Sequence, residues 1–163
     1  MPNDRVCVFN RTRQSFLSLD TKVADTHLSR LLGLIGRRRL GPNEGLWLAP
    51  CQGIHTIGLF FPIDVVYLGL GGEVLHLVEN VSPFRITPLR RNAHSVLELP
   101  VRTIYESQTR VGDQVVICSA ESLEGASSTK EWLNQVAERK VEEGVVEEPT
   151  AAMRWPVPKP EGG

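Results

Sequence analysis

Residues 51–68 read CQGIHTIGLFFPIDVVYL and form the longest apolar stretch of this 163-residue chain. The β-branched and aromatic residues of Ile54–Phe61 predict one strand, and Ile63–Leu68 predicts a second strand after the interruption at Pro62. Asp64 lies between two apolar residues of this second strand. A buried carboxylate is costly unless it is hydrogen-bonded or paired, so we expect Asp64 to have a partner.

Two helices and several further strands are predicted around this stretch. A helix capped by Asp25 or Thr26 would have one buried stripe, formed by Leu28, Leu31, Leu32 and Ile35. The capping-box spacing of Thr103 and Glu106 predicts a short helix over Val101–Ser107. The other predicted strands are Arg5–Phe9, Ser15–Val23, Gly45–Leu48, Glu73–Val81, Ser95–Leu99 and Gln114–Cys118. These elements predict a mostly β (α+β) domain with one or two short helices.

The charge distribution divides the chain in two. Residues 1–120 hold 13 Lys+Arg and 10 Asp+Glu, a net charge of +3, whereas residues 121–163 hold 5 and 9, a net charge of −4. We therefore expect a β domain over residues 5–120. Residues 121–163 are expected to form an acidic, Pro-containing C-terminal helix and tail that is partly disordered. Trp132, Leu133, Val136 and Ala137 would form the apolar stripe of that helix.

Composition excludes several classes of protein. The overall net charge of −1 gives no argument for a nucleic-acid partner. We see neither the apolar core of a signal peptide nor an apolar run of transmembrane length, so a cytoplasmic location is expected. The three cysteines, Cys7, Cys51 and Cys118, are odd in number and widely spaced. They match neither a disulfide framework nor a CxxC zinc site, which favours a reducing compartment.

Four blocks of the sequence resemble domain-of-unknown-function family 192. The blocks are GLIGRRRLGPNEGLWLAP, GIHTIGLFFPIDVVYLG, SVLELP and RVGDQVVI, and the match extends over about Val6 to Ile117. The resemblance implies a compact, barrel-like, antiparallel β domain with one or two short helices. It implies no chemistry, because the family has no agreed activity.

The resemblance also marks recurring polar positions and some departures. In this chain the recurring positions are Arg37, His55, Thr56, Asp64, Glu98 and Asp113. The usual Met of the first block is Ile35, and the Met and basic residue before Phe-Pro are Leu59 and Phe60. The usual Gly after VLELP is Arg102. Loss of the basic residue at Phe60 removes one partner for a carboxylate or an anionic ligand.

Each candidate site residue has a structural alternative. His55 is either a histidine satisfied within the fold or a ligand or base, and Cys51 lies four residues before it without a further ligand cluster. Asp64 either accepts backbone N–H groups or pairs with Arg37, and Glu98 has the same two interpretations. Asp113 is expected in a turn before the last strand. We therefore expect no bound metal.

Three functional hypotheses follow. We find no GxSxG, P-loop or GxGxxG motif, so serine hydrolase, NTPase and dinucleotide-enzyme interpretations have no support, and no cofactor is expected. The first hypothesis is a non-catalytic binding module whose polar groove near His55, Asp64 and Glu98 takes a small hydroxyl-rich or peptide ligand. The second is an adaptor that binds another protein through the tail. The third is a hydrolase with carboxylate and histidine acid–base chemistry, which lacks an evident nucleophile.

Overall fold

The computed structural model describes residues 5–119, apart from the side chains of His27, Leu28, Leu31 and Ser119. Its two helices are α1 (His27–Leu32) and α2 (Thr103–Glu106). Its strands are β1 (Arg5–Asn10), β2 (Ser15–Ala24), β3 (Glu44–Leu48), β4 (Ile63–Leu68), β5 (Val74–Val81), β6 (Ser95–Pro100) and β7 (Val115–Ser119). The helix and tail expected after residue 120 lie outside the described residues.

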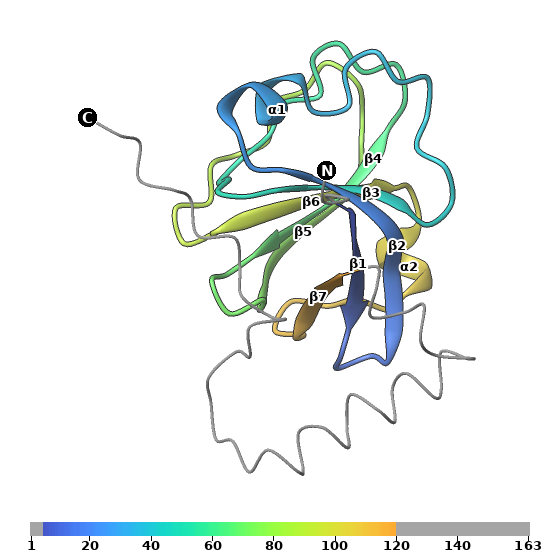
Figure 1. Cartoon of the computed structure of the whole chain (residues 1–163), viewed down its shortest axis with the longest axis vertical. Helices are drawn as coiled ribbons and strands as arrows, with labels where there is room; N and C mark the ends of the chain where they lie inside the picture. The colour runs from blue at the N-terminus through green and yellow to red at the C-terminus, as the bar shows by residue number, and fades with distance from the viewer. Residues whose placement is uncertain (1–4, 120–163) are drawn as a thin grey trace.

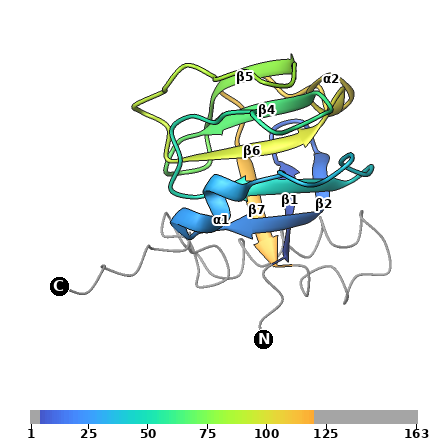
Figure 2. The same cartoon turned by 90° about the horizontal axis from the view of Figure 1, so that it is seen from above.

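The strands form one curled sheet in the order β5-β4-β6-β3-β2-β1-β7 (Figures 1 and 2). Every neighbouring pair is antiparallel except β2 and β3, which are parallel and are connected through α1. The curl brings the two edges together at one point, where a bridge joins Glu73, before β5, to Gln114, before β7. The mostly β, barrel-like fold is therefore confirmed, as a half-barrel with one parallel pair.

Strand β4 separates two apolar cores. It lies between β5 and β6, and all six of its residues are buried. Because successive side chains of a strand point to opposite faces, Ile63, Val65 and Tyr67 enter one core. Val66 and Leu68 enter the other core, which also contains Ile104 of α2. The core around Val65 includes Leu34, which follows α1, so the two helices cover different faces of the sheet.

The segment before β4 is a loop, so the strand predicted over Ile54–Phe61 is wrong. Its one ladder contact is the isolated bridge between His55 and Ile86. The chain then turns, because Leu59 donates its backbone N–H to the carbonyl of Thr56 at 3.1 Å and Gly58 adopts a φ of +86°. This backbone conformation favours glycine and ends the extended run that the apolar composition suggested.

Helix α1 is shorter than predicted. Thr26 caps its start through a reciprocal capping box with Ser29, and Gly33 ends it with a φ of +45°. The predicted buried stripe is wrong for Leu32 and Ile35, which are 51% and 45% exposed. The side chains of the other two stripe residues, Leu28 and Leu31, are outside the described part. Leu34 fills the core instead, because the chain leaves the helical path at Gly33.

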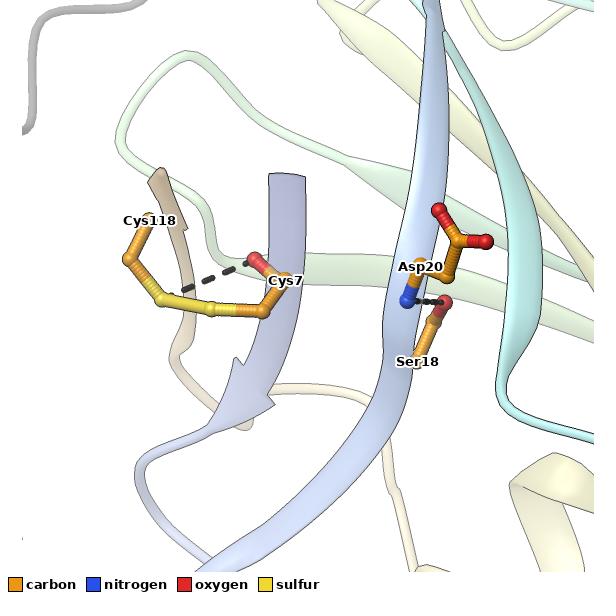
Figure 3. The surroundings of a disulfide bond; sticks show 4 residues. All are labelled: Cys7, Ser18, Asp20 and Cys118. Atoms are coloured by element: carbon orange, nitrogen blue, oxygen red, sulfur yellow. Dashed lines mark hydrogen bonds between the residues drawn. A yellow bond between two sulfur atoms is a disulfide. The ribbon is translucent and has the colours of Figure 1, made fainter. Parts of the chain in front are cut away.

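A disulfide joins Cys7 of β1 to Cys118 of β7, which corrects the prediction that the cysteines fit no disulfide (Figure 3). The two residues are register partners in the antiparallel pair, with their Cα atoms 5.3 Å apart. The two cysteines are 111 residues apart in the sequence, and the order of strands in the sheet brings them together. The spacing of the cysteines does not reveal this strand order. Cys51 is the free cysteine of the described residues.

We find no helix within residues 5–119 that is long and apolar enough to cross a membrane.

Candidate functional site

A cavity of about 270 Å³ lies between the C-terminal end of α1, the loop that follows β3 and the face of β6. Its wall is mostly apolar, with a few polar or ionisable side chains. The apolar side chains are Leu32, Leu34, Ile35, Leu48, Ile54 and Leu59. The polar or ionisable side chains are Arg30, Cys51, His55 and Glu98. The cavity is thus a small apolar pocket with convergent polar groups, as is typical of ligand sites.

Glu98 is the most unusual group of the cavity. It lies in β6 opposite Leu46 and Val65, and only 3% of its surface is exposed. Its Oε2 atom has no hydrogen-bond partner among the described residues. Burial raises the pKa of this carboxyl from 4.5 to about 8. Glu98 is therefore mostly protonated at neutral pH, which makes it a hydrogen-bond donor.

Gly33, at the end of α1, lies beside this carboxyl. A Cβ atom built at Gly33 would lie 4.0 Å from Oε2 of Glu98 and 3.8 Å from Leu46. The positive φ that ends α1 also favours glycine at this position. Gly33 therefore both terminates the helix and shapes the wall of the cavity.

Cys51 and His55 lie on the loop side of the cavity. The thiol of Cys51 donates to the carbonyl of Gly53 at 3.1 Å. The backbone N–H of Cys51 donates to the backbone carbonyl of His94 at 2.9 Å. Burial is the main cause that raises the pKa of the Cys51 thiol, and the nearby Glu98 adds to it. His55 is partly buried, and its Nδ1 atom has no partner among the described residues. The predicted site residues His55 and Glu98 thus share one cavity.

Asp64 lies on the other face of the sheet from that cavity. It pairs with Leu99, whereas its neighbour Val65 pairs with Glu98, so the two carboxylates point to opposite cores. The Oδ1 atom of Asp64 accepts from the backbone N–H of Asn80 at 2.9 Å, and Oδ2 accepts from Ile104 at 3.0 Å. The expected partner is therefore two backbone donors. This placement does not match the predicted groove, which combined Asp64 with His55 and Glu98.

Thr56 fastens the loop beside the cavity. Its hydroxyl donates to the carbonyl of Ser82 at 2.8 Å and accepts from the backbone N–H of Arg85 at 2.8 Å. Its backbone N–H donates to the carbonyl of Arg85, and its carbonyl accepts from the backbone N–H of Phe84. Thr56 is fully buried. Its contacts therefore position the loops, and its side chain does not line the cavity.

Arg37 and Asp113 lie away from the cavity. The Arg37 guanidinium reaches Glu44 at 3.3 Å, and both side chains are about a third exposed. Asp113 is buried and accepts from Asn10 at 3.0 Å, Arg13 at 2.9 Å and the backbone of Arg110 at 2.8 Å. Burial acts to raise the pKa of Asp113, but the hydrogen bonds from Arg13, Asn10 and Arg110 outweigh it and lower the pKa. Both residues therefore fix local structure.

The geometry offers little for covalent catalysis. A cysteine nucleophile needs a thiolate, which a lowered pKa or an adjacent base supplies. The Cys51 thiol instead has a raised pKa and donates to a carbonyl. Within residues 5–119 no group of three or more His, Cys, Asp and Glu side chains is arranged to hold a metal ion.

Sequence patterns missed part of the cavity wall. Arg30 lies at the wall and donates to the carbonyl of Asp25 at 2.8 Å. No sequence pattern marked Arg30 as part of a site. The glycine at position 33 was a visible signal, since a helix-ending glycine permits close approach, but the sequence did not show what approaches it. Only the register of β6 reveals that Glu98 faces this helix end.

Comparisons with known proteins place this fold among uncharacterised relatives. A UPF0127 protein of Thermococcus sibiricus is 26% identical over 137 residues, which cover 79% of this chain and 86% of the relative. A solved protein of Sinorhizobium meliloti, described as a "putative transcription regulator", is 22% identical with a TM-score of 0.61. The match covers 69% of this chain and 92% of that protein's chain. A solved protein of unknown function from Novosphingobium aromaticivorans, also 22% identical, has a TM-score of 0.60, with coverages of 68% and 82%. At these identities the solved structures show the shared fold alone.

The family assignment rests on the match to a family model. The model of the family DUF192, described as an uncharacterised ACR, matches residues 8–117. This range begins within β1 and ends within β7, so it includes part or all of every strand and the whole cavity. The chain belongs to the DUF192 family.

Proposed function

We propose that this domain is a non-catalytic binding module that takes a small, uncharged molecule into the cavity at Glu98. The observation that carries the proposal is the Oε2 atom of Glu98, which is buried, faces the cavity and has no partner among the described residues. An unpaired buried polar atom is destabilising, and a ligand atom would satisfy it. A hydrogen-bond acceptor of the ligand would receive the Glu98 proton.

The cavity selects for an apolar body with one polar end. Leu34, Leu48 and Leu59 are buried leucines of its wall, which gives little support to the hydroxyl-rich ligand suggested by the sequence. Burial disfavours charge here, because it raises the pKa of both Glu98 and Cys51. A volume of about 270 Å³ suits a fragment-sized molecule or one side chain of a peptide.

Three probes with the same apolar body and different heads test this function. Isovaleramide is neutral, isovalerate is anionic and isoamylamine is cationic near neutral pH. We expect isovaleramide to bind best, with a dissociation constant of about millimolar for so small a ligand. Chemical-shift changes of Ile54 and Leu59, followed by NMR during titration, would locate the binding.

Two variants of full-length protein control the experiment. Glu98→Leu removes the donor inside the cavity and should abolish the preference for the amide. Glu44→Gln changes a part-exposed carboxylate on the neighbouring strand and should leave the titration unchanged. Preferential binding of the amine, or shifts that avoid the cavity, would contradict the proposed ligand class. Turnover of any probe would contradict a non-catalytic role and revive the hydrolase hypothesis.

The cytoplasmic location stays a prediction. Disulfides persist mainly in oxidising compartments, so the Cys7–Cys118 pair weighs against a reducing location. The redox state of these two cysteines, trapped by alkylation as cells are lysed, would decide between the two compartments.

A further inference from the structure

Large apolar side chains are exposed around the mouth of the cavity. They come from the end of α1, the loop before β4 and the loop after β5, and each is between 45% and 79% exposed. We call this set the apolar rim: Ile35, Ile57, Phe60, Phe84, Ile86 and Leu89. A concentration of exposed apolar side chains on a small domain marks an interaction surface.

Contacts between its segments hold the rim together. The rings of Phe60 and Phe84 meet edge to face with their centroids 5.8 Å apart. The His55–Ile86 bridge joins the two loops, and Ile35 packs over Gly58, where a Cβ atom would lie 3.4 Å from its side chain. Figure 1 shows α1 and the loop before β4 at the same end of the sheet. The rim is therefore a surface that the fold positions.

Basic side chains border this surface. Four arginines, Arg38, Arg39, Arg85 and Arg91, are exposed on the segment after α1 and on the loop after β5. Arg37 pairs with Glu44, but within residues 5–119 none of these four has an ion pair. An apolar surface with unpaired positive charge at its border suits an acidic, amphipathic partner.

We propose that the apolar rim docks residues 128–143 of this same chain through Trp132, Leu133 and Val136. These apolar residues recur at helical spacing among Glu131, Glu138, Glu142 and Glu143. Residues 128–143 themselves hold 4 acidic and 3 basic residues, a net charge of −1, within a tail (residues 121–163) whose net charge of −4 complements the bordering arginines. This docking goes beyond ligand binding and does not depend on it.

Tether length permits the contact. Trp132 lies 13 residues after Ser119, the end of β7, and an extended chain spans about 3.3–3.6 Å per residue, or roughly 45 Å. A compact domain of about 100 residues has a radius of gyration of only about 13 Å, so the extended tether is more than three times that length and reaches far around the domain. A short tether gives an effective concentration of about millimolar, at which a weak interface is occupied.

Tryptophan fluorescence of the full chain tests the docking. The Trp155→Phe variant leaves Trp132 as the reporter beside Trp47, which is 3% exposed and gives a constant background. We expect blue-shifted Trp132 emission and protection from acrylamide. The double substitution Phe60→Ser/Ile86→Ser should shift the emission to the red and remove the protection. Its two sites are 79% and 76% exposed, so the fold should survive, which the unchanged Trp47 signal would verify.

A matched control distinguishes the rim from general surface apolarity. Leu70→Ser/Val111→Ser removes side chains that are 65% and 61% exposed in turns outside the rim, and it should leave Trp132 protected. Solvent-exposed Trp132 in the parent chain, or equal effects of both double variants, would overturn the proposal. Protection that increases with protein concentration would also overturn it and indicate a second copy as the occupant.

Discussion

The carboxylate of Asp64 in β4 accepts a hydrogen bond from the backbone N–H of Ile104 in α2 at 3.0 Å, across 40 residues of sequence. Its other oxygen accepts from the backbone N–H of Asn80 at the end of β5. Asn80 has a φ of +54° and Arg102, before α2, has a φ of +73°. One buried side chain therefore satisfies donors at two strained points of the backbone.

Replacing Asp64 by alanine should lower the free energy of unfolding by about 3 kcal/mol, because two backbone donors lose a charged acceptor in a buried place. Urea denaturation of wild type and Asp64→Ala would measure the change. His55→Ala is the matched variant, since the Nδ1 atom of His55 has no partner to lose, and it should change stability by less than about 1 kcal/mol. An Asp64→Ala protein as stable as wild type would refute the structural role.

The acceptor that caps α2 could not be predicted from the sequence of the helix itself. Thr103 and Glu106 have capping-box spacing, but the hydroxyl of Thr103 donates to the carbonyl of Pro100 at 2.7 Å. Arg102, at the N-cap position of α2, makes no side-chain capping bond. The capping acceptor comes from β4 instead. An Asp inside an apolar strand was enough to predict a partner, but only the packing of α2 against the sheet identifies it.

Strand periodicity predicted most of the sheet but only part of the site. The apolar and β-branched composition of β4 and β6 was visible, and their existence and type are confirmed. The pairing of Val65 with Glu98 was not visible, and this register places Asp64 and Glu98 on opposite faces. The apolar run before Pro62 suggested a strand, but the turn at Gly58 was not detectable from β propensity alone.

Glu98→Gln should change how stability depends on pH. The folded-state pKa of about 8 lies above the ordinary value of 4.5, so the folded protein keeps a proton that the unfolded chain releases. The contribution of Glu98 is therefore complete below pH 4.5 and is lost as the pH rises toward about 8. Relative to Glu98→Gln, wild type should lose up to about 1.4 kcal/mol per pH unit within this window.

Denaturant melts of both proteins at half-unit steps from pH 4.5 to 8.5 would measure this difference. Glu44→Gln, the same change at a part-exposed carboxylate of the neighbouring strand, is the control. Parallel profiles for wild type and Glu98→Gln would show that the buried carboxyl is ionised throughout, and the donor role proposed for the cavity would then fail.

A chain that ends at Ala120 should unfold in one cooperative transition, with a stability within about 1–2 kcal/mol of the full chain. The described sheet is completed by β7, which ends at Ser119. Both apolar cores are formed from residues that precede Ser119. A docked C-terminal segment would add only the small energy of a weak contact. Differential scanning calorimetry of the two chains would measure it, and an unfolded short chain would show that the domain boundary is misplaced.

The double variant Cys7→Ser/Cys118→Ser should be less stable than the oxidised wild type by about 2–5 kcal/mol, because the crosslink closes a long loop in the unfolded chain. The edge strand β7 pairs along its length only with β1, so its amides should exchange with solvent faster in the variant. Hydrogen exchange and urea denaturation would measure both effects. Cys51→Ser is the control and should leave both unchanged, since Cys51 is free. Equal stability of oxidised wild type and the double variant, with β7 amides equally protected, would show that strand pairing alone holds this edge and that the disulfide adds nothing to the fold.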